Sequence, residues 1–191
     1  MCNYQIVTDS CCDFTREQYK KLKLVWVPLT LRYKGAEMDS LTEPAELHDF
    51  YDGVRSGEMP TTSAVNPDAW ERAMEGALKE GRDVLCLAFT GALSTTYQSA
   101  VIAANELREK YPERKIIVVD TLCAALGQGL LVWHACRKRS MARIIFSLSS
   151  AQVVSLMLRR RPLISSSISR GVMGCASCTP CGCIWCGGRS L

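Results

Sequence analysis

Hydroxyl side chains gather at two places where the sequence predicts the start of a helix. Ser94 and Thr96 lie in residues 90–100, where an apolar strand ends at a glycine and a helix follows. The first backbone N–H groups of a helix lack partners within it and carry partial positive charge, so they suit an anion. The run contains no lysine or arginine. Hydroxyls and amides without a full positive charge suit one carboxylate better than a triphosphate.

The second cluster is Thr61-Thr62-Ser63, in an expected loop before a helix that begins at Asn66-Pro67. Asparagine as the N-cap followed by proline at the first helical position is a strong helix start. A simpler interpretation makes Ser94 or Thr95 only an N-cap, whose side-chain oxygen accepts a hydrogen bond from the helix. Two hydroxyl clusters at two helix starts leave both capping and ligand binding open.

Several enzyme motifs are absent from the sequence. It contains no Gly-x-x-x-x-Gly-Lys-Ser/Thr phosphate loop, no Gly-x-Gly-x-x-Gly and no Gly-x-Ser-x-Gly. The two histidines, His48 and His134, are predicted on helices away from the hydroxyl clusters, so an esterase that uses Ser94 is disfavoured. Asp9 and Asp120 could hold Mg²⁺, but isolated aspartates at strand ends more often cap the following turn. We therefore predict a binding site without catalytic residues, metal or cofactor.

Alternating strand and helix patterns predict the framework that positions these side chains. Strands are expected at 5–7, 24–29, 84–89 and 116–119, a hairpin turns at Lys34-Gly35, and helices are expected over 15–23, 42–57, 66–81, 97–111 and 124–135. Such alternation indicates an α/β fold with a layered, mostly parallel sheet flanked by helices. Ligands bind beyond the carboxyl ends of the strands in such sheets. Small and polar residues follow those ends at 8–10, 90–91 and 120–121.

Charge divides the chain into two unlike parts. All 19 acidic residues lie in the first 120 positions, whereas the last 71 contain nine lysines and arginines and no acid. A soluble domain is normally about a quarter charged, with both signs mixed. No signal peptide is recognisable, and the apolar run at 144–158 is too short for a transmembrane segment. A cytoplasmic protein with reduced cysteines is expected.

Five motifs occur in order along the first part of the chain: Ile6-Val7-Thr8-Asp9-Ser10-Cys11-Cys12-Asp13, Val27-Pro28-Leu29, Pro60-Thr61-Thr62-Ser63, Leu93-Ser94-x-Thr96-Tyr97-Gln98-Ser99-Ala100, and Val119-Asp120-Thr121 through Gly127-Gln128-Gly129. Over about residues 1–136 their order and spacing resemble the DegV family of bacterial fatty-acid-binding proteins. The resemblance implies two domains that hold a long-chain fatty acid such as palmitate between them. It also implies a carrier, not an enzyme. Its partner is the catalytic subunit of a fatty acid kinase, which phosphorylates the carboxylate, and no nucleic acid is expected.

The resemblance assigns the fatty-acid carboxylate to Thr62 and Ser94. Burial of the acyl chain would supply most of the affinity, at about 0.8 kcal/mol per CH₂. Three further hydroxyl side chains are expected to support the site: Ser63, Ser10 and Thr96. Thr95 stands where the family usually has glycine, and a β-branched residue suits a positive φ poorly. We therefore expect an altered loop geometry but not the loss of the site.

Residues 137–191 do not share the resemblance to residues 1–136, the lipid-binding α/β domain. They form a basic, irregular tail with cysteines at 175, 178, 181, 183 and 186. Cys-x-x-Cys repeats indicate zinc or an iron–sulfur cluster, so a cysteine-cluster metalloprotein is the alternative function, and a basic tail could also bind nucleic acid. We expect instead that a change of reading frame near codon 136 replaced the second domain. Such a truncated protein would bind palmitate weakly and expose an apolar edge.

Overall fold

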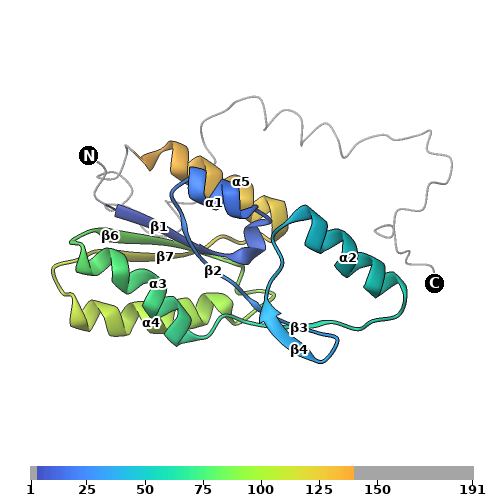
Figure 1. Cartoon of the computed structure of the whole chain (residues 1–191). Coiled ribbons are helices and arrows are strands. Elements are labelled where there is room, and N and C mark those ends of the chain that lie inside the picture. Colours follow the sequence, from blue (N-terminus) through green and yellow to red (C-terminus); the bar gives the residue numbers. More distant parts are fainter. Residues whose placement is uncertain (1–3, 140–191) are drawn as a thin grey trace, which may run out of the picture. The chain divides into compact units, whose positions relative to one another are not determined.

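The computed structural model describes residues 4–139, which form two sheets with helices packed against them (Figure 1). The larger sheet has the strand order β2-β1-β6-β7, and every neighbouring pair is parallel. Its strands are β1 (Tyr4–Asp9), β2 (Val25–Val27), β6 (Asp83–Ala88) and β7 (Ile116–Asp120). The predicted α/β fold with a mostly parallel sheet is confirmed, and the carboxyl ends of β1, β6 and β7 lie at one edge.

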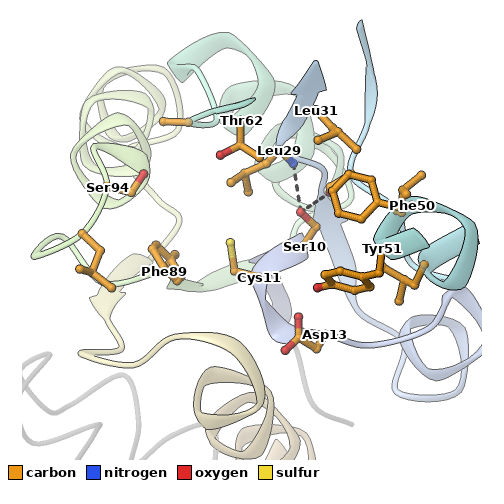
Figure 2. A pocket seen from close by; sticks show the side chains of 15 residues that line it. Ser10, Cys11, Asp13, Leu29, Leu31, Phe50, Tyr51, Thr62, Phe89 and Ser94 are labelled. Carbon is orange, nitrogen blue, oxygen red and sulfur yellow. Dashed lines mark hydrogen bonds between the residues drawn. The ribbon is translucent and has the colours of Figure 1, made fainter. Parts of the chain in front are cut away.

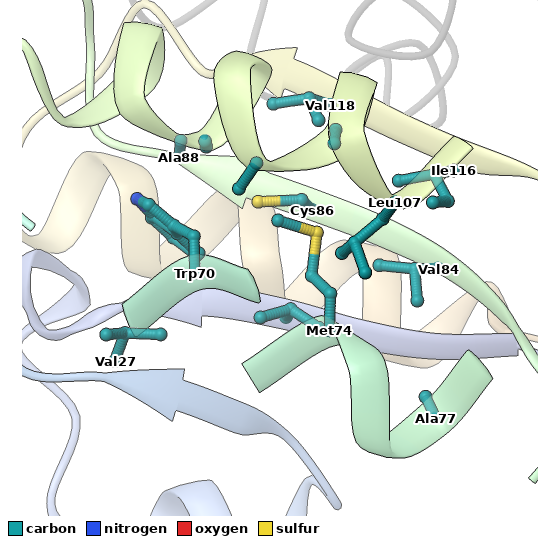
Figure 3. Packing of buried hydrophobic residues seen from close by; sticks show 14 of the residues in the cluster. Val27, Trp70, Met74, Ala77, Val84, Cys86, Ala88, Leu107, Ile116 and Val118 are labelled. Carbon is teal, nitrogen blue, oxygen red and sulfur yellow. The ribbon is translucent and has the colours of Figure 1, made fainter. Parts of the chain in front are cut away.

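Helices cover both faces of this sheet (Figure 1). On one face α3 (Pro67–Lys79) and α4 (Thr96–Lys110) pack over Val84 and Cys86, with Trp70 and Met74 fully buried (Figure 3). On the other face α1 (Arg16–Lys21) and α5 (Ala125–Arg137) pack over strand residues that include Leu85. Successive strand residues point to opposite faces, so both faces must be apolar. This explains the continuous apolar runs in the sequence.

A second, antiparallel sheet has the order β4-β3-β5. Its strands are β3 (Thr30–Tyr33), β4 (Ala36–Asp39) and β5 (Thr61–Ser63), and α2 (Pro44–Arg55) lies between β4 and β5 in the chain. The predicted hairpin is confirmed: Lys34 and Gly35 have φ angles of 50° and 77°, as a two-residue turn with positive φ at both positions requires. The predicted loop at 58–65 is wrong at Thr61–Ser63. These residues form a strand because they pair with β3, which is distant in the sequence.

Local capping signals account for several helix starts. Thr15 and Gln18 form a capping box at the start of α1, and Asn66 accepts a hydrogen bond from the N–H of Ala69 at 2.8 Å. The helix expected from residue 42 begins slightly later, because Glu43 is the N-cap of α2 and its N–H donates to Glu46. Within residues 4–139 no helix is long and apolar enough to cross a membrane.

Candidate functional site

A pocket of about 530 Å³ opens beyond the carboxyl ends of β1 and β6 (Figure 2). Its walls come from the 3₁₀ turn η1 (Ser10–Cys12), the small sheet, α2 and the loop that precedes α4. The apolar lining comprises Leu29, Leu31, Leu41, Leu47, Phe50 and Leu93, with Tyr51, Ala64 and Phe89. Ligand pockets are typically lined by apolar side chains with a few placed polar groups, and the hydroxyls of Ser10, Thr62 and Ser94 are such groups here.

Thr62 and Ser94, the two predicted carboxylate ligands, both line this pocket. Figure 2 shows their side chains pointing toward one another at one end of it. Thr62 lies opposite Leu31 in the pairing of β5 with β3, and both face the pocket. Because strand side chains alternate between faces, Ser63 points the other way. Ser63 does not line the pocket, so its expected supporting role has no basis in the geometry.

Ser94 also organises the start of α4. Its Oγ accepts a hydrogen bond from the N–H of Thr96 at 3.2 Å and lies 2.9 Å from the Thr96 hydroxyl. The first turn of α4 contains no acidic residue. Thr95 is the N-cap residue with φ of −76° and no side-chain capping bond. Since this φ is ordinary for a β-branched residue, the altered loop geometry expected from Thr95 is not required.

Thr96 and Ser10 support the site in different ways. Thr96 is fully buried and contacts Ser94, and its carbonyl oxygen accepts a hydrogen bond from Trp70 Nε1 at 3.2 Å. Thr96 therefore acts behind the pocket wall. Ser10 lines the pocket, where its Oγ accepts from the Leu29 N–H at 3.0 Å and from the Ser40 hydroxyl at 2.5 Å. With both lone pairs occupied, Ser10 can offer a ligand its own proton.

Asp9 connects the strands beneath the pocket. Its carboxylate accepts hydrogen bonds from the N–H groups of Cys11 (3.0 Å) and Phe89 (2.7 Å) and from Gln128 Nε2 (3.0 Å). Burial raises the pKa of Asp9, while these N–H donors act in the opposite direction. Cys11 and Phe89 both line the pocket, so Asp9 positions two of its walls. Asp120 likewise accepts from the N–H groups that follow β6 and β7, as predicted for a turn cap.

Several lining residues escaped the sequence analysis. Leu47, Phe50 and Tyr51 of α2 form one wall of the pocket. The apolar periodicity of this helix predicts that one of its faces is turned inward, but it does not predict a pocket there. Cys11 also lines the pocket. Burial, and then the neighbouring Asp9, raise the pKa of the Cys11 thiol. The thiol therefore stays protonated and unreactive.

The comparisons with known proteins agree with this architecture. The model of a family described as "uncharacterised protein, DegV family" matches residues 3–141. The chain belongs to the DegV family. A DegV domain-containing protein of Clostridium perfringens is 39% identical over 146 residues, which are 76% of this chain and 50% of that protein. The match to the family extends past residue 136, where the resemblance was expected to end.

Solved structures of DegV proteins share the fold. One is described as showing fatty acid binding of a DegV family protein from Thermus thermophilus; it is 34% identical with a TM-score of 0.65 over 82% of this chain and 52% of that one. Another is the Fatty Acid Kinase (Fak) B3 protein of Streptococcus pneumoniae loaded with linoleic acid. It is 25% identical with a TM-score of 0.60 over 81% of this chain and 53% of that one. The chain spans about half the length of these relatives.

The predictions for the tail lie outside the described residues, except that Arg137, expected to begin the irregular tail, is the last residue of α5. The cysteine cluster at 175–186 and the rest of the tail are not described, and the change of reading frame near codon 136 stays a prediction. Within residues 4–139 no group of three or more histidine, cysteine or acidic side chains could hold a metal ion. A cysteine-cluster metal site in the tail therefore stays a prediction.

Proposed function

We propose that this protein binds a long-chain fatty acid such as palmitate, with its carboxylate at Thr62 and Ser94. The observation that carries the proposal is the convergence of these two hydroxyls, from β5 and from the start of α4, at one end of a largely apolar pocket. The DegV structures described as fatty-acid-binding support it.

The head-group end supplies donors without a formal charge. The Thr62 and Ser94 hydroxyls can each donate to a carboxylate oxygen, and the partial positive charge at the start of α4 favours an anion there. The first turn of α4 holds no acidic residue that would compete for that position. Such a site can bind one carboxylate through hydrogen bonds, without the lysine or arginine that a phosphate group would require.

The acyl chain would occupy the apolar part of the pocket, between Leu29 and Leu31 on one side and Leu47 and Phe50 of α2 on another. Each buried CH₂ contributes about 0.8 kcal/mol, so a long chain supplies most of the affinity.

The same proposal makes the protein a carrier that presents the fatty acid to the catalytic subunit of a fatty acid kinase. The name of the Streptococcus pneumoniae relative, a Fatty Acid Kinase B3 protein, supports this partner. Among the described residues no histidine lines the pocket, and burial keeps the pKa of its Cys11 thiol well above the ordinary value. The lining residues are therefore suited to holding the carboxylate for another protein's chemistry, and no catalytic role is proposed for them.

Calorimetric titration of the full chain with palmitate tests the proposal. A hydrogen bond to a charged group is worth about 1.5–3 kcal/mol, so Thr62→Val and Ser94→Ala should each weaken binding by about 10- to 100-fold. Ser63→Ala is the matched control, since it removes a hydroxyl from the same strand on the opposite face, and it should leave binding unchanged.

Two results would contradict the proposal. Equal binding of palmitate and its methyl ester would show that the carboxylate is not recognised. Native mass spectrometry that finds bound zinc or iron, with no affinity for fatty acids, would favour the cysteine-cluster alternative.

A further inference from the structure

Asp13 is the one acidic side chain among the described residues that line the pocket. It follows η1 directly and adopts a left-handed backbone conformation with φ of 54°. Figure 2 shows it on the far side of the pocket from Thr62 and Ser94, near Tyr51. The proposed ligand is itself an anion, and the proposed carboxylate site at Thr62 and Ser94 does not explain why an acidic side chain lines the same pocket.

Asp13 lies near the start of α5. Burial raises the pKa of Asp13, and the backbone N–H of Leu126, in the first turn of that helix, acts in the opposite direction. The N-cap residue, Ala124, offers no side-chain cap, and the first turn of α5 contains no acid of its own. Asp13 therefore supplies the negative charge that the N-terminus of α5 favours.

The two helix starts near the pocket are thus unlike. At α5 an acidic side chain of the protein, Asp13, lies near the first turn. At α4 the corresponding groups are the hydroxyls of Ser94 and Thr96, with no acid in the first turn. One end of the pocket holds an acidic side chain, whereas the other offers hydroxyl and N–H donors with partial positive charge.

We propose that Asp13 is a specificity-determining residue that restricts the pocket to acyl chains with a single anionic end. The inference rests on the proposed fatty-acid function and deepens it. A monocarboxylate places its charge at Thr62 and Ser94 and its methyl end toward Asp13. A dicarboxylate of matching length would place its second charge against Asp13.

The size of the effect follows from the exposure of Asp13, which is solvent-accessible. Two like charges about 4 Å apart in water lower an affinity by about fivefold. Exclusion of water by the bound chain increases that penalty, because screening weakens as the local dielectric constant falls. A terminal ammonium group in place of the second carboxylate would reverse the sign and strengthen binding.

The test is titration of the full chain with saturated monocarboxylates from octanoate to hexadecanoate, and with α,ω-dicarboxylates and ω-amino acids of the same lengths. At the length that reaches Asp13, the dicarboxylate should bind about fivefold more weakly than the monocarboxylate, and the ω-amino acid more tightly. Asp13→Asn keeps the size and shape of the side chain, removes its charge and should abolish both differences. Asp68→Asn, which removes an exposed first-turn acid from α3, is the matched control and should preserve them.

The ratio between ligands separates specificity from folding, since a merely destabilised pocket weakens all ligands alike. Unchanged ratios in Asp13→Asn, or equal binding of mono- and dicarboxylates by the wild type at every length, would overturn the inference. Both results still allow tight binding of monocarboxylates, which would leave the proposed function intact. Failure of the wild type to bind any monocarboxylate would overturn the proposed function and this inference with it.

Discussion

Replacing Gly129 by alanine would push α5 away from the segment that carries part of the pocket wall. A Cβ at this position would lie 2.4 Å from the carbonyl oxygen of Cys12 and 3.1 Å from a ring carbon of Phe14. Ordinary contacts of a Cβ begin near 3.4 Å, so α5 and η1 must separate by about 1 Å. The obstructing atom belongs to the backbone and cannot rotate away.

The expected cost combines two opposing effects. Alanine inside a helix is more favourable than glycine by about 1 kcal/mol. Overpacking a tight contact typically costs about 1–3 kcal/mol, and a backbone clash belongs at the upper end of that range. Gly129→Ala should therefore lower the free energy of unfolding by about 1–2 kcal/mol. Gly76→Ala in α3 meets no atom within 4 Å and is the control, with an expected stabilisation of about 0.5–1 kcal/mol.

Urea denaturation of the full-length variants measures these differences, and titration with palmitate measures their effect on the site. Binding should weaken in Gly129→Ala but not in Gly76→Ala, because η1 contributes Ser10 and Cys11 to the pocket. Equal stability of Gly129→Ala and Gly76→Ala would contradict this reasoning. It would show that the close packing of α5 on η1 does not position Ser10 and Cys11.

Two further predictions address the packing around α3 and α4. Trp70→Phe removes the Nε1–H that donates to the buried Thr96 carbonyl at 3.2 Å. Urea denaturation should show that the free energy of unfolding falls by about 1–3 kcal/mol, and palmitate binding through Ser94 should weaken. An unaltered free energy of unfolding would contradict this prediction. The Lys110 ammonium is the main cause that lowers the pKa of Glu75 to about 2, from an ordinary pKa of 4.5. The ionised Glu75 therefore stabilises the fold above pH 4.5, and this stabilisation disappears as the pH falls toward 2. Glu75→Gln should therefore be less stable than the wild type at pH 7, with a difference in thermal midpoint that shrinks between pH 5 and pH 2; a constant difference would refute the assignment.

Local sequence was sufficient for much of the fold. The Asn66-Pro67 start and the Lys34-Gly35 turn depend on residues a few positions apart, and both occur as predicted. The Thr15 capping box is equally local. Apolar runs at β6 and β7 reflect burial on both faces of a parallel sheet, so they were recognisable without any knowledge of their partners. The placement of Thr62 and Ser94 in one pocket also agrees with the motifs that suggested them.

Tertiary contacts decided the remainder of the site. Thr61–Ser63 is a strand only because β3 lies beside it, and that pairing turns Thr62 into the pocket and Ser63 away. Asp9 accepts hydrogen bonds from the N–H groups of Cys11 and of Phe89, which directly follows β6 and lies 80 residues away in the chain. Asp13 likewise lies near the start of α5. Spacing along a chain predicts contacts between near neighbours. The sequence thus determined the sheet, most helix starts and the presence of two hydroxyl clusters, whereas pairing between distant segments decided which side chains line the pocket and where its acidic side chain lies.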